Sequence, residues 1–189
     1  ELEFEKYAVG QSVTRTEDPR LLRGDGRYTD DINLAGQAYA YMFRSPYAHG
    51  RIQVLDVTPA REMPGVIMVV TAQDLNDAGV SPLPCGLPVK NRDGSDMRKP
   101  PRPSLAEGTV RFRGEACALV VAESHAQARD AAEAIILEVA DLPAVTDARE
   151  ALHPSAPCLH VEAPGNLALD WEFGPTDTVN AAFKGAHHV

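Results

Sequence analysis

The sequence of 189 residues contains 44% hydrophobic and 24% charged residues, a composition typical of a globular domain. Its 27 acidic and 18 basic residues give a net charge of −9. This charge argues against binding to nucleic acid or to an anionic membrane, because phosphate contacts need a clustered basic face.

The three cysteines, Cys85, Cys117 and Cys158, are far apart in the sequence. They therefore lack the ligand spacing of a zinc site or an iron–sulfur cluster, and we expect reduced thiols in a cytoplasmic protein. No apolar run approaches the roughly 18 residues that a membrane-spanning helix needs, so we expect no membrane insertion.

In chain order, the N-terminal segments come first. Residues 16–32 mix charges and glycines with isolated apolar residues, a pattern that is neither helical nor strand-like and predicts an ordered loop. Gly24 and Gly26 lack the third glycine and the preceding strand of a dinucleotide-binding motif, so we interpret them as turn residues. Residues 37–45 are apolar at successive positions, which predicts a strand that is buried on both faces or covered by a partner.

Short elements follow: a strand at 50–57, a helix at 56–63, a strand at 66–70 and a capped helical turn at 71–75. In the first of these strands, Ile52, Val54 and Val57 are predicted to share one side. Residues 78–108 are rich in proline and glycine, which excludes regular structure over most of this loop. We expect its charged middle, residues 90–99, to be mobile.

In the second half of the chain, the sequence predicts strands at 108–112, 116–122 and 135–139, and a helix from Ser124 to about residue 134. This helix presents a small-residue face that suits close packing on a sheet: Ala128, Ala131, Ala132 and Ile135. Beyond residue 154 we predict an extended segment, a strand at 166–173, a helix capped by Thr176 and ending at 184, and the start of a strand at 186–189.

No pattern indicates a catalytic or metal site. The six histidines do not pair with one another, with cysteines or with acids at a metal-ligand spacing, and no G-x-S-x-G nucleophile motif occurs. The pair Asp30 and Asp31 is compatible with acid–base catalysis, but adjacent acids in a glycine-containing loop more often cap, pair with arginine or face water. We therefore predict no catalytic, cofactor-binding or metal-ligating residue.

Six residues are instead candidates for contacts with a partner: Arg20, Arg23, Arg27, Arg44, Tyr47 and His49. The arginines suit an interface because the guanidinium group makes bidentate contacts to carboxylates with little reorganisation.

The motifs that carry a family resemblance are residues 15–22 (RTEDPRLL), 24–31, 43–49 (FRSPYAH), 63–66 (MPGV), 110–115 (VRFRGE), 120–123, 126–133, 142–145 (LPAV) and 163–166 (APGN). In this order they resemble the N-terminal region of the large, molybdenum-cofactor-binding subunit of the xanthine dehydrogenase, aldehyde oxidase and carbon monoxide dehydrogenase family, the molybdenum hydroxylases. The segment at 170–174 looks more like the bacterial carbon monoxide dehydrogenase and aldehyde oxidase branch.

The resemblance implies an α+β fold, the α/β hammerhead domain, which has a mixed sheet, few helices and here an extended C-terminal segment. It divides the chain into an N-terminal arm at 1–15, the hammerhead domain at 16–150, and a linker with the start of the cofactor-binding domain at 151–189. In family members the complete subunit holds a molybdenum–pterin cofactor, often in its cytosine dinucleotide form. Iron–sulfur clusters and FAD lie on partner domains or subunits. The family's pterin-binding segments and its catalytic glutamate are far C-terminal to these motifs, so no such role transfers to a residue here.

Two functions remain open. The first is a structural and assembly domain of a molybdenum hydroxylase large subunit, whose complete enzyme oxidises carbon monoxide, an aldehyde or an N-heterocycle with oxygen from water. The second is a stand-alone interaction module that binds a separately encoded cofactor-binding partner. A hydrolase acting at Asp30 and Asp31 is disfavoured. Because the family continues for several hundred residues, we expect a fragment of a larger subunit, whose isolated chain self-associates through the strand at 37–43 or the C-terminal strand.

Overall fold

The structure, a computed structural model, describes residues 13–188 and divides the chain into two units, Glu1–Gln37 and Ala38–Val189. Most of the arm expected at 1–15 lies outside the described residues. In the first unit, the short helix α1 (Asp18–Leu22) has Pro19 in its first turn, and the 3₁₀ turn η2 (Thr29–Asp31) follows. The segment expected as an ordered loop without helical periodicity therefore contains two short helical turns. None of the residues that form these turns is buried.

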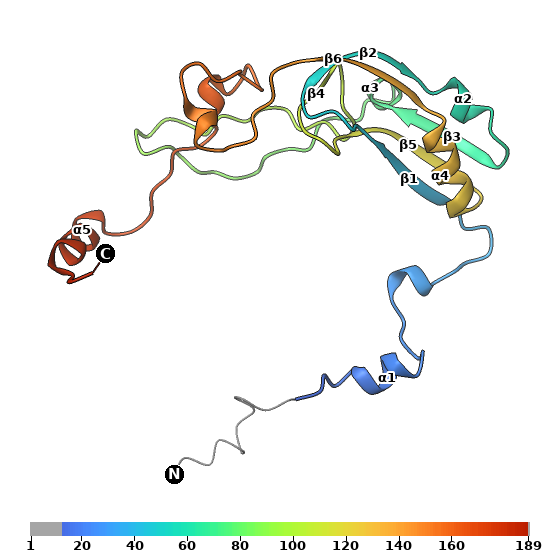
Figure 1. Ribbon diagram of the computed structural model, residues 1–189, viewed down its shortest axis with the longest axis horizontal. Helices are drawn as coiled ribbons and strands as arrows, with labels where there is room; N and C mark the ends of the chain where they lie inside the picture. Colours follow the sequence, from blue (N-terminus) through green and yellow to red (C-terminus); the bar gives the residue numbers. More distant parts are fainter. Residues whose placement is uncertain (1–12, 189) are drawn as a thin grey trace. The chain divides into compact units, whose positions relative to one another are not determined.

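The second unit is built on two three-stranded sheets in which every pairing is antiparallel (Figure 1). The first sheet has the order β1 (Tyr39–Arg44), β5 (Ala116–Ala122), β3 (Val66–Thr71). The second sheet has the order β4 (Thr109–Val110), β2 (Gly50–Asp56), β6 (Ile136–Asp141). The helices are α2 (Thr58–Arg61), α3 (Ala72–Asp77), α4 (His125–Glu133) and α5 (Thr176–Gly185), with 3₁₀ turns η3 (Glu150–Leu152) and η4 (Pro164–Asn166). The expected α+β class is confirmed.

Helix α4 covers one face of the first sheet (Figure 1). Ser124 caps the helix, because its hydroxyl accepts a hydrogen bond from the Gln127 amide at 3.3 Å. The predicted small-residue face is confirmed, since Ala128, Ala131 and Ala132 are fully or almost fully buried. Their small side chains let the helix lie close to β5, where Val120 is also fully buried.

Strand β2 differs from its predicted pattern. The pairing with β6 shifts between Ile52 and Val54, which places one extra residue in β2 and forms a bulge. Beyond this bulge the alternation reverses, so Leu55 packs in the core with Ile52 while Val54 is exposed. The expectation that Ile52 and Val54 share one side of a regular strand was therefore wrong.

The C-terminal predictions were partly wrong. Residues 166–173 form no strand, and residues 186–188 are irregular rather than strand. Helix α5 is present, but Pro175 occupies its N-cap position and the Thr176 hydroxyl is hydrogen-bonded to Glu172 instead of capping the helix. No helix among residues 13–188 is long and apolar enough to span a membrane.

Candidate functional site

The loop after α1 is closed by its own polar groups. The Asp25 amide donates to the Arg20 carbonyl, and Arg20 Nε donates to the Asp25 carbonyl, both at 3.0 Å. Arg23 Nε donates to Asp25 Oδ2 at 3.2 Å, and Gly24 between them has φ +76°, a conformation that favours glycine. Two of the predicted interface arginines are thus bonded within the loop, where they fix its shape.

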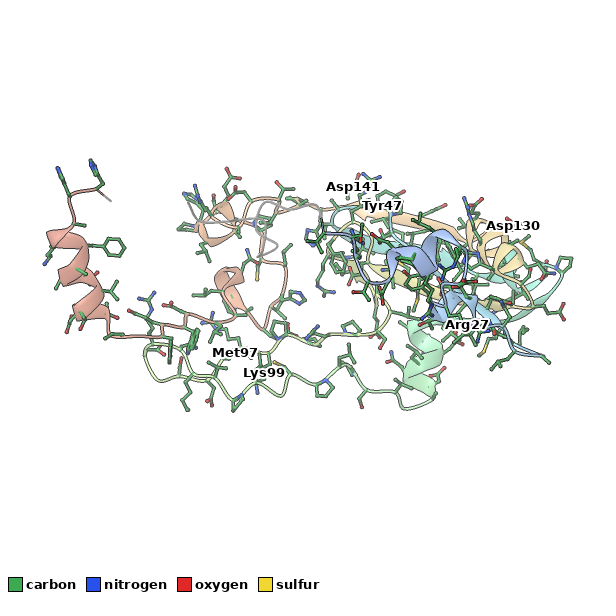
Figure 2. All side chains as sticks on the ribbon, turned by 90° about the horizontal axis from the view of Figure 1, so that it is seen from below. Arg27, Tyr47, Met97, Lys99, Asp130 and Asp141 are labelled. Atoms are coloured by element: carbon green, nitrogen blue, oxygen red, sulfur yellow. The ribbon has the colours of Figure 1, made fainter. Side chains whose placement is uncertain are left out.

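Large apolar side chains project from this N-terminal unit without cover inside it. The exposed fraction is 86% for Leu22, 71% for Leu34, 61% for Tyr28 and 58% for Ile32. Arg27 is exposed as well (Figure 2). Sequence reasoning singled out the arginines and missed these apolar side chains as contact residues, although isolated apolar residues in a charged loop were the available signal. A loop of fixed shape with uncovered apolar residues is suited to docking.

The motifs at 43–49 and 110–115 are one structural unit. Ser45 is buried, and its carbonyl accepts a hydrogen bond from the Gly114 amide at 2.8 Å. The Ser45 amide donates a hydrogen bond to the Glu115 carbonyl at 2.9 Å. Arg44 Nη1 donates to the Gly114 carbonyl at 2.8 Å, and the Arg111 amide donates to a Glu115 carboxylate oxygen at 2.5 Å. These bonds hold the turn after β1 against the turn before β5.

Three interface candidates from the sequence lie at this turn. Arg44 is exposed, Tyr47 is half-buried against the apolar cluster around Cys117, and His49 is only 7% exposed. The ring of His49 is hydrogen-bonded through Nδ1 to the Pro143 carbonyl at 2.6 Å. His49 is thus part of the interior of this unit, a position that favours a structural role.

The charged middle of the long loop, expected to be mobile, is tied to the segment that follows η4. The Arg92 amide donates to the Asp170 carbonyl at 2.8 Å, and the Arg98 amide donates to the Ala168 carbonyl at 3.0 Å. The Arg92 guanidinium also pairs with both Asp170 and Glu172. Met97 and Lys99 lie on this paired stretch (Figure 2).

Within the motif at 163–166, the side chain of Asn166 has a structural role. Its amide nitrogen donates to the carbonyls of Ala151 and Pro157, and its amide oxygen accepts from the Leu159 amide, all at 2.9 to 3.0 Å. Its φ of +56° is one that asparagine tolerates better than most residues. This side chain therefore fixes the irregular segment that precedes it.

The face of the first sheet opposite α4 is apolar. The strand register places Ala40, Val121 and Met68 in one row across the three strands, and Met42, Leu119 and Val70 in the next. Met42 is 39% and Met68 is 50% exposed. We call these six residues the open face. They confirm that β1 is apolar on both sides. In the structure as described for residues 38–188, this second side is only partly covered: Val70, Leu119 and Val121 are half-buried, and the other three residues are exposed.

The resemblance implies a molybdenum–pterin cofactor for the complete subunit, and the described residues offer no metal-ligand group for it. Among residues 13–188, no group of three His, Cys, Asp or Glu side chains is placed to hold a metal ion. One hollow, about 720 Å³, is open to solvent and is lined by a single segment, residues 144–157, which includes η3.

The family model of the aldehyde oxidase and xanthine dehydrogenase a/b hammerhead domain matches residues 23–143, well over half of the chain. The chain belongs to this family. Its hammerhead domain contains both sheets, the helix α4 and the paired turns at 44–49 and 111–115.

Relatives resemble the hammerhead chain over nearly its whole length. The nicotine 6-hydroxylase large subunit of Paenarthrobacter nicotinovorans is 38% identical over 97% of this chain and 22% of its own length. The carbon monoxide dehydrogenase large chain of Hydrogenophaga pseudoflava is 34% identical over 90% of this chain and 21% of its own. A solved Cu,Mo-CO dehydrogenase is similar with a TM-score of 0.69 at 30% identity, covering 94% of this chain and 22% of that chain. The chain thus spans about a fifth of the length of these relatives.

Proposed function

We propose that this chain is the structural and assembly domain of a molybdenum hydroxylase large subunit. Membership of the hammerhead family and similarity to large subunits over 90% or more of the chain support the proposal. The observation that carries it is the combination of a well-packed interior with exposed apolar side chains. Among residues 13–188, no group of side chains is placed to hold a metal ion. An apolar surface of this kind indicates contact with other protein rather than chemistry at this domain.

In the complete enzyme, the molybdenum–pterin cofactor would supply the oxidation of carbon monoxide, an aldehyde or an N-heterocycle. We propose that this cofactor is held by the remainder of the large subunit and that iron–sulfur and FAD groups lie on partner subunits. The residues of this chain would hold the hammerhead shape and present its apolar surfaces. The absence of a pairing among Cys85, Cys117 and Cys158 supports a cytoplasmic enzyme.

The test is expression of the complete large subunit with its partner subunits under cofactor-replete conditions. Molybdenum content per subunit is measured together with dye-linked oxidation of carbon monoxide, aldehydes and N-heterocycles. We expect close to one molybdenum per large subunit and activity with one of these substrate classes. A folded complete subunit that contains no molybdenum would contradict the proposal.

The assembly role is tested separately with a pair of variants on opposite sides of the first sheet. Val121→Asp places a charge on the open face, whereas Asp130→Asn alters the exposed outer side of α4 (Figure 2). We expect Val121→Asp to lower the yield of assembled enzyme and Asp130→Asn to leave it unchanged. Equal yields for the two variants would remove the open face from the proposed role.

A further inference from the structure

We infer that the open face of the first sheet is covered by an amphipathic helix from the same large-subunit polypeptide, outside residues 1–189. This inference rests on the proposed function and names the partner of the hammerhead surface. The open face consists of Ala40, Met42, Met68, Val70, Leu119 and Val121.

The composition of the open face indicates that it is buried in the working protein. An antiparallel sheet with one face in water normally alternates apolar residues inside with polar residues outside. Here both faces are apolar, and none of the six open-face residues carries a charge or a hydrogen-bonding side chain. The methionines Met42 and Met68 add unbranched side chains that adapt to a packing partner. The occupant must therefore be apolar itself.

The dimensions of the open face select a helix. Three strands at the usual spacing of about 4.8 Å place the axes of the two outer strands about 10 Å apart, a distance that matches the diameter of one α-helix with its side chains. The opposite face already follows this arrangement, because the single helix α4 covers it with Ala128, Ala131 and Ala132. A second helix on the open face would place the first sheet between two helical layers.

The area of the open face selects an occupant in the same polypeptide. Two rows of three residues cover roughly 200 Å², estimated from strand spacing and rise. A stable interface between separate chains needs about 800 Å² on each partner. A segment of the same polypeptide does not need this area, because the chain holds it at a high effective concentration. The length of the relatives provides such a segment, since this chain spans only 22% of the nicotine 6-hydroxylase large subunit.

Photo-crosslinking in the assembled enzyme tests the inference. The photoreactive residue p-benzoylphenylalanine is incorporated at position 68, whose methionine is half exposed, and in a control at position 130 on the outer side of α4. After irradiation, mass spectrometry identifies the crosslinked peptides. We expect position 68 to crosslink within its own polypeptide to a peptide outside residues 1–189, at sites three or four residues apart. Position 130 should give at least tenfold less of this product.

The inference is overturned if position 68 crosslinks to a second copy, to a smaller subunit or to residues 1–37, or if it gives no more product than position 130. Molybdenum content is measured in the same preparations. Normal molybdenum with a wrong crosslink rejects the covering helix and leaves the proposed function standing, whereas a complete subunit without molybdenum rejects the proposed function itself.

Discussion

The two faces of the first sheet are made by the same three strands but have different surroundings. On the covered face, Val120 packs under α4 and is fully buried, whereas its neighbour Val121 points to the open face and is only half-buried. Both faces are apolar, so composition does not distinguish them. The difference indicates that the covered face stabilises the hammerhead unit, while the open face is available for contact with other protein.

Exchange of a single valine for aspartate separates the two faces most strongly. Val120→Asp buries a charge without a partner under α4, and we expect it to cost about 3–5 kcal/mol of the free energy of unfolding. Val121 is half-buried on the open face, so Val121→Asp should cost less, about 1–2 kcal/mol, and should reduce self-association of the chain. Urea unfolding followed by circular dichroism, with light scattering for self-association, compares the pair. Equal destabilisation by both variants would show that the faces do not differ.

Gly50 tests the close approach of β2 to β6 in the second sheet. A Cβ atom at this position would lie 2.8 Å from the Ala140 carbonyl oxygen and would also collide with the Val139 side chain. We expect Gly50→Ala to destabilise the chain by about 1–3 kcal/mol, measured by urea unfolding. Gly86→Ala is the matched control, because nothing lies within 4 Å of its Cβ position and the change should be close to neutral. A neutral Gly50→Ala would mean that the strands are farther apart.

Cys117 gives a pH-dependent measure of burial in the core. Burial, and secondly the nearby Glu115 carboxylate, raise the pKa of its thiol from 9.0 to about 11. Between these values the unfolded chain binds fewer protons at this thiol than the folded chain, so the free energy of unfolding falls as pH rises from 9 to 11. The loss should be at most about 3 kcal/mol. It should be absent in Cys117→Ala, whose unfolding is measured over the same pH range; an identical pH dependence in both proteins would contradict the assignment.

The smallest effect is expected for an exposed ion pair on the paired loop. Arg92 is 58% exposed in its pairs with Asp170 and Glu172. Because solvent screens such charges, Arg92→Ala should change the free energy of unfolding only slightly, and added salt should reduce even this difference. Unfolding at low and high salt checks both statements. A larger, salt-independent loss would show that this loop belongs to the core.

The sequence predicted the elements near α4 because helix capping and the spacing of small residues determine the structure there. Ser124 caps the helix, and the alanine spacing marks the side that packs on β5. The bulge between Ile52 and Val54 was not predictable, because the pairing with β6 sets it and no residue type marks it. The sequence of residues 166–173 favours a strand, but a strand also needs a partner strand, which the local sequence does not reveal. The backbone partners of this segment lie in an irregular loop near Arg92 and Arg98.

The interface candidates show a similar limit. Arginine-rich sequence drew attention to Arg20 and Arg23, but their distances to Asp25 show that they serve the loop itself. His49 is buried, and its ring is hydrogen-bonded to the carbonyl of Pro143, a residue far away in the sequence. The sequence predicted only part of the open face. The apolar residues at 37–45 indicated a strand with two apolar sides, but they did not indicate whether this chain or a partner covers the second side.

Methionine oxidation tests the central claim most directly, because native residues report on the open face without substitution. Met42 and Met68 lie on this face, whereas Met63 packs against the core and serves as an internal reference. Oxidation by hydrogen peroxide is followed by mass spectrometry in the 189-residue chain and in the complete large subunit. The account predicts rapid oxidation of Met42 and Met68 in the isolated chain and at least tenfold slower oxidation in the complete subunit, with Met63 slow in both. Equally rapid oxidation of Met42 and Met68 in the complete subunit would contradict it.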